Sequence, residues 1–371
     1  MLRNEESSEL GDTSLSWSCD IVESQNVEED PCKKYERLLT SLSGPPLELQ
    51  CRAAEEIRFL SKDDDEARSY MGANGFIHML VNFLRSAIDA CNAQAQETGA
   101  LALFNIAVNN NRNKAAILAA GAVPLLLELL DSETSEAAVA VLLMLSSLED
   151  NKASIGASGA IPSLIKLMDS ESSQCRQDAI NALYNLSTFK GNRSYMVSAG
   201  AVSRLAHLLV GAEGDCTEKC LTILYHLAAI EEGRATISDT EGCIGAIADI
   251  LDTGTPNAQE QAAASLLLLC TNSFEHSQMV LREGVIPSLV TLSMNGSPRG
   301  RDKAQKLLQH FREQRQRDVS CQSSTAVCTP QTSIYGESLK EKKTTHRTTS
   351  KKIGRTLSLF WKSKSFAFYQ C

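Results

Sequence analysis

The sequence predicts an all-α solenoid, a fold in which short helical units repeat along the chain and stack on one another. Two repeating patterns predict it: a Gly followed by an apolar run recurs six times, and a second apolar helical pattern follows each copy. Composition agrees, because 43% of the residues are hydrophobic but only 5% are aromatic. The core must therefore be built mostly from Leu, Ala, Ile and Val. One helix pair cannot bury such faces alone, whereas stacked copies can.

The first pattern marks the start of one helix in every unit. Successive glycines are 46, 38, 41, 42 and 42 residues apart, and three of the runs carry Pro at the same offset. Gly allows a sharp turn between helices, and Pro is tolerated in the first turn of a helix. The glycines are Gly75, Gly121, Gly159, Gly200, Gly242 and Gly284, and the prolines are Pro124, Pro162 and Pro287.

The second pattern predicts another helix, with apolar residues at i and i+3 on the face that must be buried. Its leading residues are 46, 39, 41, 41, 43 and 41 apart, and a period near 40 is typical of armadillo or HEAT arrays. We predict a right-handed superhelix of about six repeats plus a partial seventh, capped by a basic helix over 300–315. The leading residues are Ile57, Leu103, Leu142, Leu183, Leu224, Leu267 and Leu308.

Charge marks the domain boundaries. Residues 1–31 carry nine acidic side chains against one arginine, and residues 320–371 carry nine Lys or Arg against two Glu. Both ends are rich in Ser and Thr and lack a helical period. We predict a disordered acidic arm over 1–32, an armadillo-repeat domain over 33–317 and a disordered basic tail over 318–371. The domain between the arms is acidic, which argues against nucleic-acid binding.

Several broad classes are excluded by the remaining composition. No apolar run reaches the length of a membrane span, and the acidic start lacks the apolar stretch of a secretory signal. Twelve scattered cysteines without a compact framework indicate a reduced compartment. We therefore expect a monomer in the cytoplasm, the nucleus or both.

Three features resemble armadillo repeats specifically. These are the GA-(V/I)-P-x-L openings, the NLS or NIA ends of the second pattern, and the Asn-Lys or Asn-Arg pairs that follow. The pairs would begin a short first helix in the next unit. The resemblance implies a groove lined by the third helix of each unit. The pairs are Asn113-Lys114, Asn151-Lys152 and Asn192-Arg193.

The two edges of the repeats, 51–84 and 295–317, resemble the armadillo region of plant U-box ubiquitin ligases, and the end WKSKSFAFYQC resembles one branch of that family. The resemblance implies ubiquitin-transferase activity for members that carry a U-box. Residues 1–46 contain no CPIS-like opening and no GQTYER-like helix. From this sequence we expect partner binding rather than catalysis.

The groove positions can be mapped by comparison with nuclear-import receptors of this fold, where each third helix presents a Trp and, four residues later, an Asn. The Asn position falls on Phe59, Asn105, Met144, Asn185, His226 and Leu269, and the Trp position on Glu55, Leu101, Ala140, Asn181, Thr222 and Ser265. The two tryptophans of the chain lie in the arms, so import-receptor recognition is not expected. The expected partner contacts are Phe59, Asn105, Met144, Asn181, Asn185, Thr222, His226, Ser265 and Leu269.

The sequence contains none of the usual catalytic or cofactor-binding motifs, so we expect neither catalysis nor a cofactor. Cys216 and Cys220, with His207 and His226 nearby in sequence, invite a zinc interpretation, but a structural site needs two ligand pairs, so no metal is predicted. The acidic run at 63–66 is interpreted as a solvated loop. The aromatic residues on the groove helices could be anchors for a partner. They are Phe59, Phe104, Tyr184 and Tyr225.

The basic tail has three interpretations: a nuclear-localisation signal, a segment that touches an anionic membrane surface, or a solvated arm with kinase sites, of which we favour the last. Three functions stay open for the whole chain. The first is a scaffold that holds a protein partner, such as a substrate or a regulatory kinase, in the ubiquitin pathway. The second is a U-box-type ligase or a shortened form of one, and the third is an adaptor of the importin or catenin type.

Overall fold

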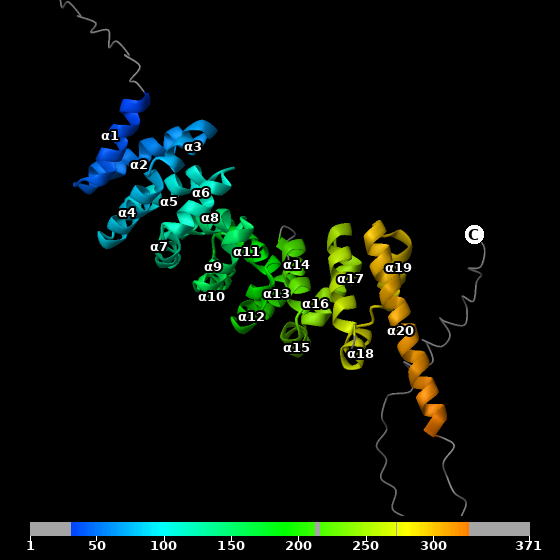
Figure 1. The fold of residues 1–371 in the computed structure, drawn as a ribbon. Helices are drawn as coiled ribbons and strands as arrows, with labels where there is room; N and C mark the ends of the chain where they lie inside the picture. Colours follow the sequence, from blue (N-terminus) through cyan, green and yellow to red (C-terminus); the bar gives the residue numbers. More distant parts are fainter. Residues whose placement is uncertain (1–30, 212–215, 272, 326–371) are drawn as a thin grey trace, which may run out of the picture. The chain divides into compact units, whose positions relative to one another are not determined.

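The computed structural model describes residues 31–211, 216–271 and 273–325, and this part of the chain contains twenty α-helices and one 3-10 turn, η1 (Lys190–Asn192) (Figure 1). The chain divides into two compact units, residues 1–317 and 318–371. The acidic arm and most of the basic tail predicted from the sequence lie outside the described residues. At the two boundaries, Pro31 begins the first helix and the last one runs to Thr325.

The helices come in repeating units of a first, a second and a third helix, and a pair of helices precedes the first full unit. The first helices are α3 (Asp65–Ala73), α6 (Asn111–Ala119), α9 (Glu149–Ala157), α12 (Arg193–Ser198), α15 (Glu231–Asp239) and α18 (Phe274–Arg282). The second helices are α1 (Pro31–Ser43), α4 (Phe76–Asp89), α7 (Ala122–Leu129), α10 (Ala160–Leu167), α13 (Ala201–Val210), α16 (Cys243–Thr253) and α19 (Ile286–Asn295). The third helices are α2 (Leu47–Lys62), α5 (Ala93–Ala107), α8 (Ser135–Ser146), α11 (Ser173–Thr188), α14 (Thr217–Ala228), α17 (Pro256–Cys270) and α20 (Pro298–Thr325).

The predicted helix starts are confirmed at every glycine of the first pattern. All six glycines have positive φ, between +73° and +90°, and a second helix begins one or two residues later. A residue with a Cβ is strained in this conformation, so the sequence places Gly there. The Asn-Lys pairs at Asn113 and Asn151 lie in the first turns of α6 and α9, and Asn192 ends the turn η1 that precedes α12. The basic helix predicted over 300–315 lies within α20, the third helix of the last unit.

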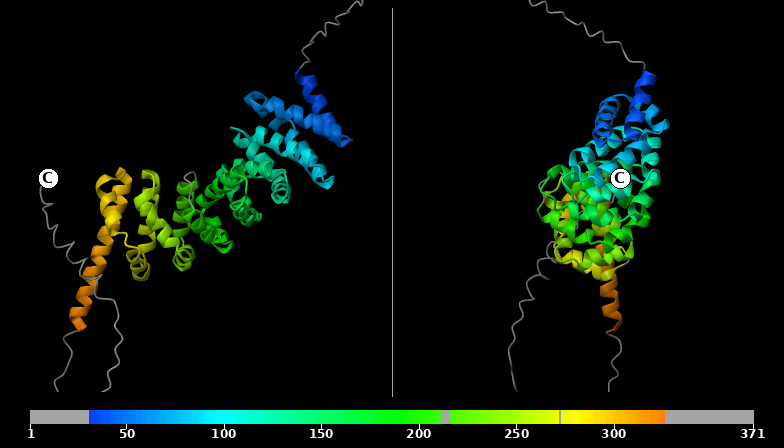
Figure 2. Two further views of the ribbon diagram at one scale, coloured as in Figure 1. Left: turned by 180° about the vertical axis from the view of Figure 1, so that it is seen from behind. Right: turned by 90° about the vertical axis from the view of Figure 1, so that its left-hand side faces the viewer.

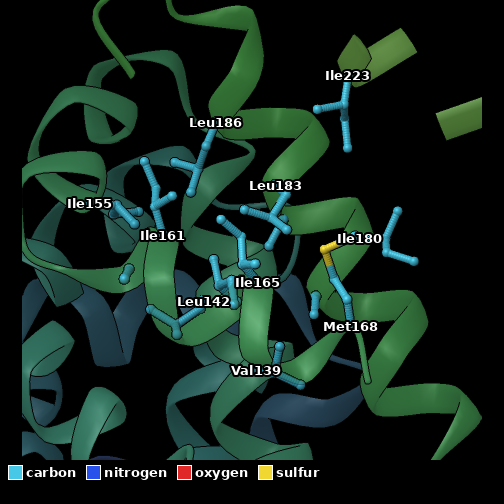
Figure 3. Close-up of a cluster of buried hydrophobic side chains, with 14 of the residues drawn as sticks. Val139, Leu142, Ile155, Ile161, Ile165, Met168, Ile180, Leu183, Leu186 and Ile223 are labelled. Carbon is cyan, nitrogen blue, oxygen red and sulfur yellow. The ribbon is translucent and has the colours of Figure 1, made fainter. Parts of the chain in front are cut away.

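Third helices of successive units pack side by side from α2 to α17, in chain order (Figures 1 and 2). Their buried faces combine with the second helices into one continuous apolar cluster. Figure 3 shows this cluster between two units, where Leu142 of α8, Ile161 of α10 and Leu183 of α11 meet at 0–1% exposure. The core is mainly aliphatic, as the low aromatic content requires, with Phe76 and Phe83 among its few aromatic residues.

Buried asparagines link neighbouring units. The side-chain amide of Asn192 donates to Lys152 O in α9 at 2.9 Å and to Leu186 O in α11 at 3.1 Å, and only 1% of the residue is exposed. Asn113 makes the equivalent pair of bonds two units earlier in the array, at 2.8 and 2.9 Å. Asn151 does so more loosely, at 3.3 and 3.1 Å. Each amide therefore ties the start of one unit to the first and third helices of the unit before it.

Glycine makes room for two of these amides. A Cβ on Gly156 would lie 1.9 Å from Oδ1 of Asn192, and one on Gly72 would lie 1.8 Å from Oδ1 of Asn113. Leu118 occupies the corresponding place beside Asn151, where the bonds are longer. The close approach of the units at Asn113 and Asn192 thus depends on a missing side chain.

Candidate functional site

The third helices leave one side partly exposed, and this side forms the candidate site. The residues that define this side on α5 to α17 include no Asp, Glu, Lys or Arg, although charged residues of the same helices, such as Glu136 and Lys219, lie nearer the helix starts. Most are half-buried, so they pack on the core and still reach the surface. We call this surface the third-helix face and define it by Leu101, Phe104, Asn105, Ala140, Leu143, Met144, Asn181, Tyr184, Asn185, Thr222, Tyr225, His226, Ala264, Leu267 and Leu268.

The stretch of the face on α5 and α8 is mainly apolar. Leu101 and Phe104 project from α5, and Leu143 and Met144 project from α8. On α2, next to this stretch, Phe59 is 79% exposed, the largest exposed fraction among the large hydrophobic residues of the described chain. An exposed aromatic ring beside a half-buried apolar strip can anchor a partner side chain.

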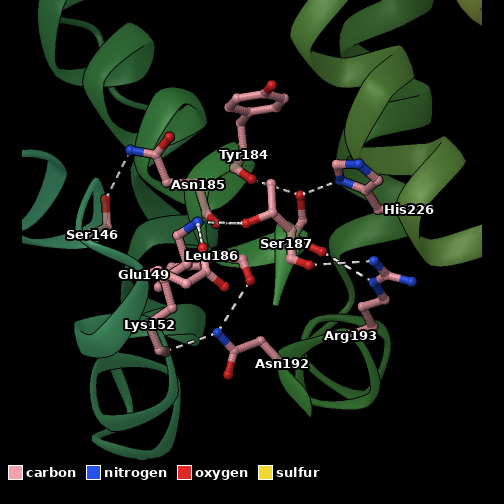
Figure 4. A network of polar contacts seen from close by, with 11 residues as sticks. Ser146, Glu149, Lys152, Tyr184, Asn185, Leu186, Ser187, Asn192, Arg193 and His226 are labelled. Carbon is pink, nitrogen blue, oxygen red and sulfur yellow. Dashed lines mark hydrogen bonds and ion pairs between the residues drawn. The ribbon is translucent and has the colours of Figure 1, made fainter. Parts of the chain in front are cut away.

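The stretch on α11 and α14 is polar and aromatic (Figure 4). The rings of Tyr184 and His226 stack across the two helices, with centroids 6.2 Å apart and planes at 29°. Lys219 Nζ lies 4.3 Å from the centroid of the Tyr184 ring. Tyr225 packs against His226 from the same helix, with centroids 5.9 Å apart. These side chains join α11 to α14 on the surface as the leucines do below it.

The protonation of His226 follows from its contacts. The Ser187 hydroxyl donates to Tyr184 O at 2.7 Å, so it can only accept from the ring, and His226 Nδ1–H donates to it at 2.8 Å. Burial lowers the pKa of His226 to about 4, and the charges of Arg193 and Lys152 act in the same direction. The ring is therefore neutral at pH 7, and its Nε2 is a hydrogen-bond acceptor.

Two predicted contact residues, Asn105 and Asn185, already bond to the preceding third helix. Asn105 Nδ2 donates to Arg58 O at 2.9 Å, and Asn185 Nδ2 donates to Ser146 Oγ at 3.1 Å. Each side-chain amide therefore uses one of its N–H groups in a bond within the protein. Among the described residues no donor binds either Oδ1, so two acceptors remain on the face.

Of the other predicted contacts, Phe59, Met144, Asn181 and Thr222 reach the surface on their helices. Ser265 and Leu269 do not, because they are 1% and 0% exposed. The prediction took Leu267 as the inward residue of α17, but the inward residue is Leu266, one position earlier. The equivalent positions, one residue earlier, are Ala264, which is 8% exposed, and Leu268, which is half-buried. The same shift applies in α20, where Leu307 is buried and Leu308 is half-buried.

The groups weighed for metal binding have other roles in the structure. Cys220 is buried, and burial beside Cys216 raises the pKa of its thiol to about 12. Asp64, in the acidic run, caps α3 by accepting from the backbone N–H of Glu66 and Ala67. No group of three possible metal ligands occurs within 31–211, 216–271 and 273–325. No helix in these ranges is long and apolar enough to cross a membrane.

The comparison with known families decides the identity of the fold. Residues 36–332 match the plant U-box protein ARM repeat region. The chain belongs to this family. U-box domain-containing protein 45 of Arabidopsis thaliana is 45% identical over 95% of the chain and 48% of its own length. U-box domain-containing protein 6 of the same plant is 43% identical over 72% of the chain and 35% of its own length. The chain thus spans about half the length, or less, of these curated relatives of the U-box family.

Solved structures agree with the armadillo arrangement, which confirms the fold class predicted from the repeats. The match with an engineered protein spans 75% of this ARM-repeat chain and 68% of the chain of that protein, with a TM-score of 0.67 and 25% identity. A designed armadillo repeat protein in complex with the peptide (KR)4 covers 63% of this chain and 99% of its own, with a TM-score of 0.56 and 21% identity.

Proposed function

We propose that the chain is a non-catalytic interaction scaffold whose third-helix face binds a segment of a partner protein in ubiquitin-ligase-linked signalling. The partner class comprises substrates of U-box ligases and kinases that regulate them. The binding unit is the armadillo domain over 33–317, acting as a monomer in the cytoplasm or the nucleus. The curated relatives supply the link to the U-box family, and the third-helix face supplies the place of binding.

The observation that carries this proposal is the composition of the third-helix face. Because this face is uncharged and carries half-buried aromatic and aliphatic side chains, removing water from it when a partner binds costs little free energy. Asn105, Asn185 and His226 add acceptors for backbone N–H groups, which an extended segment presents along its length. A designed armadillo repeat protein of the same fold is in complex with the peptide (KR)4, which supports binding of a peptide segment by this arrangement.

A selection experiment tests the proposal. The full chain is screened against a displayed library of random 12-residue segments, and selected segments are re-measured against Tyr225→Ala and against Tyr195→Ala. Tyr195 is 54% exposed on α12, away from the third-helix face, so it controls for loss of an aromatic ring. We expect at least about tenfold weaker binding for Tyr225→Ala alone. If the selected segments bind Tyr225→Ala as tightly as the unchanged protein, or lose affinity for Tyr195→Ala, binding takes place outside the third-helix face.

The alternative function is ubiquitin transfer by a U-box-type ligase of which this chain is a part. It is favoured by the names of the curated relatives, of which this chain spans half or less. A transfer assay with activating enzyme, a panel of conjugating enzymes, ubiquitin and ATP distinguishes the two, run beside a U-box armadillo ligase. Ubiquitin chains above the no-ligase background would establish the ligase function; background levels beside an active control would support the scaffold.

The importin-type alternative receives less support from the face. The positions aligned with the Trp ladder carry Leu101, Ala140 and Asn181 on α5, α8 and α11. None of these can hold a lysine stem between indole rings. We therefore do not place basic transport signals among the expected partners.

A further inference from the structure

The third-helix face has an acidic edge where the third helices begin. Glu136 on α8, Glu218 on α14 and Glu260 on α17 each lie six residues before the inward leucine of their helix, and Glu97 lies at that position on α5. Each of the first three accepts a hydrogen bond from a Ser or Thr at the start of the next third helix. The donors are Ser172, Thr255 at 2.7 Å and Ser297 at 2.8 Å.

These bonds hold the carboxylates in a row without cancelling their charge. A hydroxyl donor carries no charge, so, unlike the cation of an ion pair, it does not offset the charge of the carboxylate. The opposite charges of Asp178 and Lys219, both half-buried at this edge, offset one another, and Lys219 lies over the Tyr184 ring. A cavity of about 740 Å³ also opens at this edge, lined in part by Glu218, Asp249 and Asp252.

The opposite edge, where the third helices end, is basic. Arg193 Nε donates to Ser187 O at 3.0 Å, and Arg234 NH1 donates to Ala228 O at 3.0 Å. Lys114 Nζ donates to Ser147 Oγ at 2.9 Å. Cations at helix C-termini are stabilised by the helix dipole, so this row follows from the stacking of parallel third helices.

Acidic neighbours offset this row at two of its four positions, because Glu231 and Glu232 precede Arg234 in α15, as Glu149 and Asp150 precede Lys152 in α9. Lys152 pairs with Glu149 and also donates to Thr188 Oγ1 at 2.7 Å. Lys114, Arg193 and Arg234 have neutral oxygens as their hydrogen-bond acceptors. The positive charge along this edge is therefore concentrated at Lys114 and Arg193, in two of the four units from α6 to α15.

The acceptors on the floor fix how an extended segment can lie between these edges. In a β-strand the backbone N–H groups point at right angles to the side chains. If N–H groups bond down to Asn105, Asn185 and His226, the side chains point sideways, alternately toward one edge and the other. An α-helical partner would gain nothing from the acceptors, because its N–H groups are used within the helix.

We propose that the third-helix face selects extended partner segments in which cationic and anionic side chains alternate, so that cations meet the acidic edge and anions meet the basic edge. This inference rests on the proposed binding function and adds the chemistry of the partner to it. The two edges are about 16 Å apart, because eleven residues of helix separate them. On a strand that lies midway between the edges, Lys side chains can reach toward the acidic edge and Glu side chains toward the basic edge.

Three synthetic probes of 12 residues test the pattern. An extended 12-mer is about 40 Å long and spans about four third helices at 8–10 Å spacing. In (KE)6 all lysines lie on one side of a strand and all glutamates on the other. In (KKEE)3 the composition and net charge are the same, but each side carries both signs. The third probe, (KR)6, is cationic on both sides.

We expect the full chain to bind (KE)6 about tenfold more tightly than either other probe, measured by fluorescence anisotropy at low salt. Several partly exposed ion pairs of modest strength combine to give a factor of this size. The preference should shrink as salt rises, because salt screens exposed charges.

Matched variants assign the preference to the acidic edge. Glu136→Gln with Glu218→Gln keeps the acceptors for Ser172 and Thr255 and removes two charges, and it should abolish the preference for (KE)6. Glu128→Gln with Glu275→Gln changes net charge equally at exposed sites off the third-helix face, and it should retain the preference. Circular dichroism melting of both double variants verifies that the fold is intact.

Equal affinity for (KE)6 and (KKEE)3, or tightest binding of (KR)6, would overturn the proposed alternation. Loss of the preference in both double variants would overturn its assignment to the edge. The display selection separates these failures from failure of the binding function. Selected segments that depend on Tyr225 but lack alternating charge would leave the binding function intact and refute the inference.

Discussion

The third-helix face of α5 and α8 differs from that of α11 and α14, although the helices beneath are built alike. In both stretches the inward leucines, such as Leu142 and Leu183, are buried at 0–1% exposure. Outward, α8 presents Leu143 and Met144, whereas α11 presents Tyr184 and Asn185. The inward rows therefore determine the fold, and the outward rows are left to determine what binds. The two stretches therefore present an apolar surface and a hydrogen-bonding surface to the partner that we propose.

The most severe test compares inward and outward positions on one helix. Leu183→Asp buries a carboxylate between units, and we expect a loss of more than about 4 kcal/mol in the free energy of unfolding. Asn181→Asp lies two residues away on the outward side and should cost within about 0.5 kcal/mol. Urea denaturation followed by circular dichroism measures both. Similar losses would contradict the division into inward and outward rows.

The next largest effect concerns the buried asparagines beneath both stretches. Asn192→Ala removes two bonds of about 3 Å and leaves buried carbonyls without this donor, so we expect about 2 kcal/mol of destabilisation. Asn151→Ala removes longer bonds and should cost about half as much. Equal costs measured by urea denaturation would mean that bond geometry does not determine these contributions.

A double-mutant cycle sharpens this result. Gly156→Ala places a Cβ against Asn192 Oδ1 and should expel the amide, at a cost near that of Asn192→Ala. In the Asn192→Ala background the same substitution should be nearly neutral, because the obstructing atom is gone. Additive costs in the cycle would show that Gly156 matters for another reason.

A smaller effect distinguishes the polar stretch by its pH dependence. Because the folded pKa of His226 is about 4 and the unfolded value is about 6.5, the unfolded chain binds the proton first as pH falls. Stability from this residue is therefore present above pH 6.5 and is lost as pH falls toward 4. His226→Gln should flatten the decline of the urea midpoint over this window. If the urea midpoints of the unchanged protein and of His226→Gln fall in parallel as pH decreases, the lowered pKa of His226 is refuted.

The smallest expected effect comes from the cation over the Tyr184 ring. Lys219→Met keeps the length of the side chain and removes its charge, so it should cost about 0.5 kcal/mol. Lys219→Arg retains a cation and should restore most of the loss. If the urea midpoints of Met and Arg variants coincide, the ring contact contributes nothing to stability.

The sequence predicts well which leucines of the third helices are buried, but it predicts poorly which bonds the side chains on the third-helix face make. Both results have physical reasons. Gly75 and its equivalents report a local backbone conformation, so spacing alone locates the second helices. In α17 four consecutive leucines, 266–269, fit two registers equally, and only packing against α14 selects Leu266 and Leu269. The bonds of Asn105 and His226 join residues 47 and 39 positions apart, which no local pattern encodes.

The asparagine links also have a mechanical consequence. At the positions equivalent to Asn192, α15 carries Gly233 and α18 carries Ser277, and the backbone of Gly233 approaches Leu227 O too closely for any side chain. The units before α15 are therefore linked by buried amides, whereas Gly233 offers no side-chain bond at α15; at α18 the buried Ser277 hydroxyl donates to Cys270 O and accepts from the Gln314 amide. Pulled from its ends, the array should yield first at α15, releasing the last two units while the earlier units stay assembled.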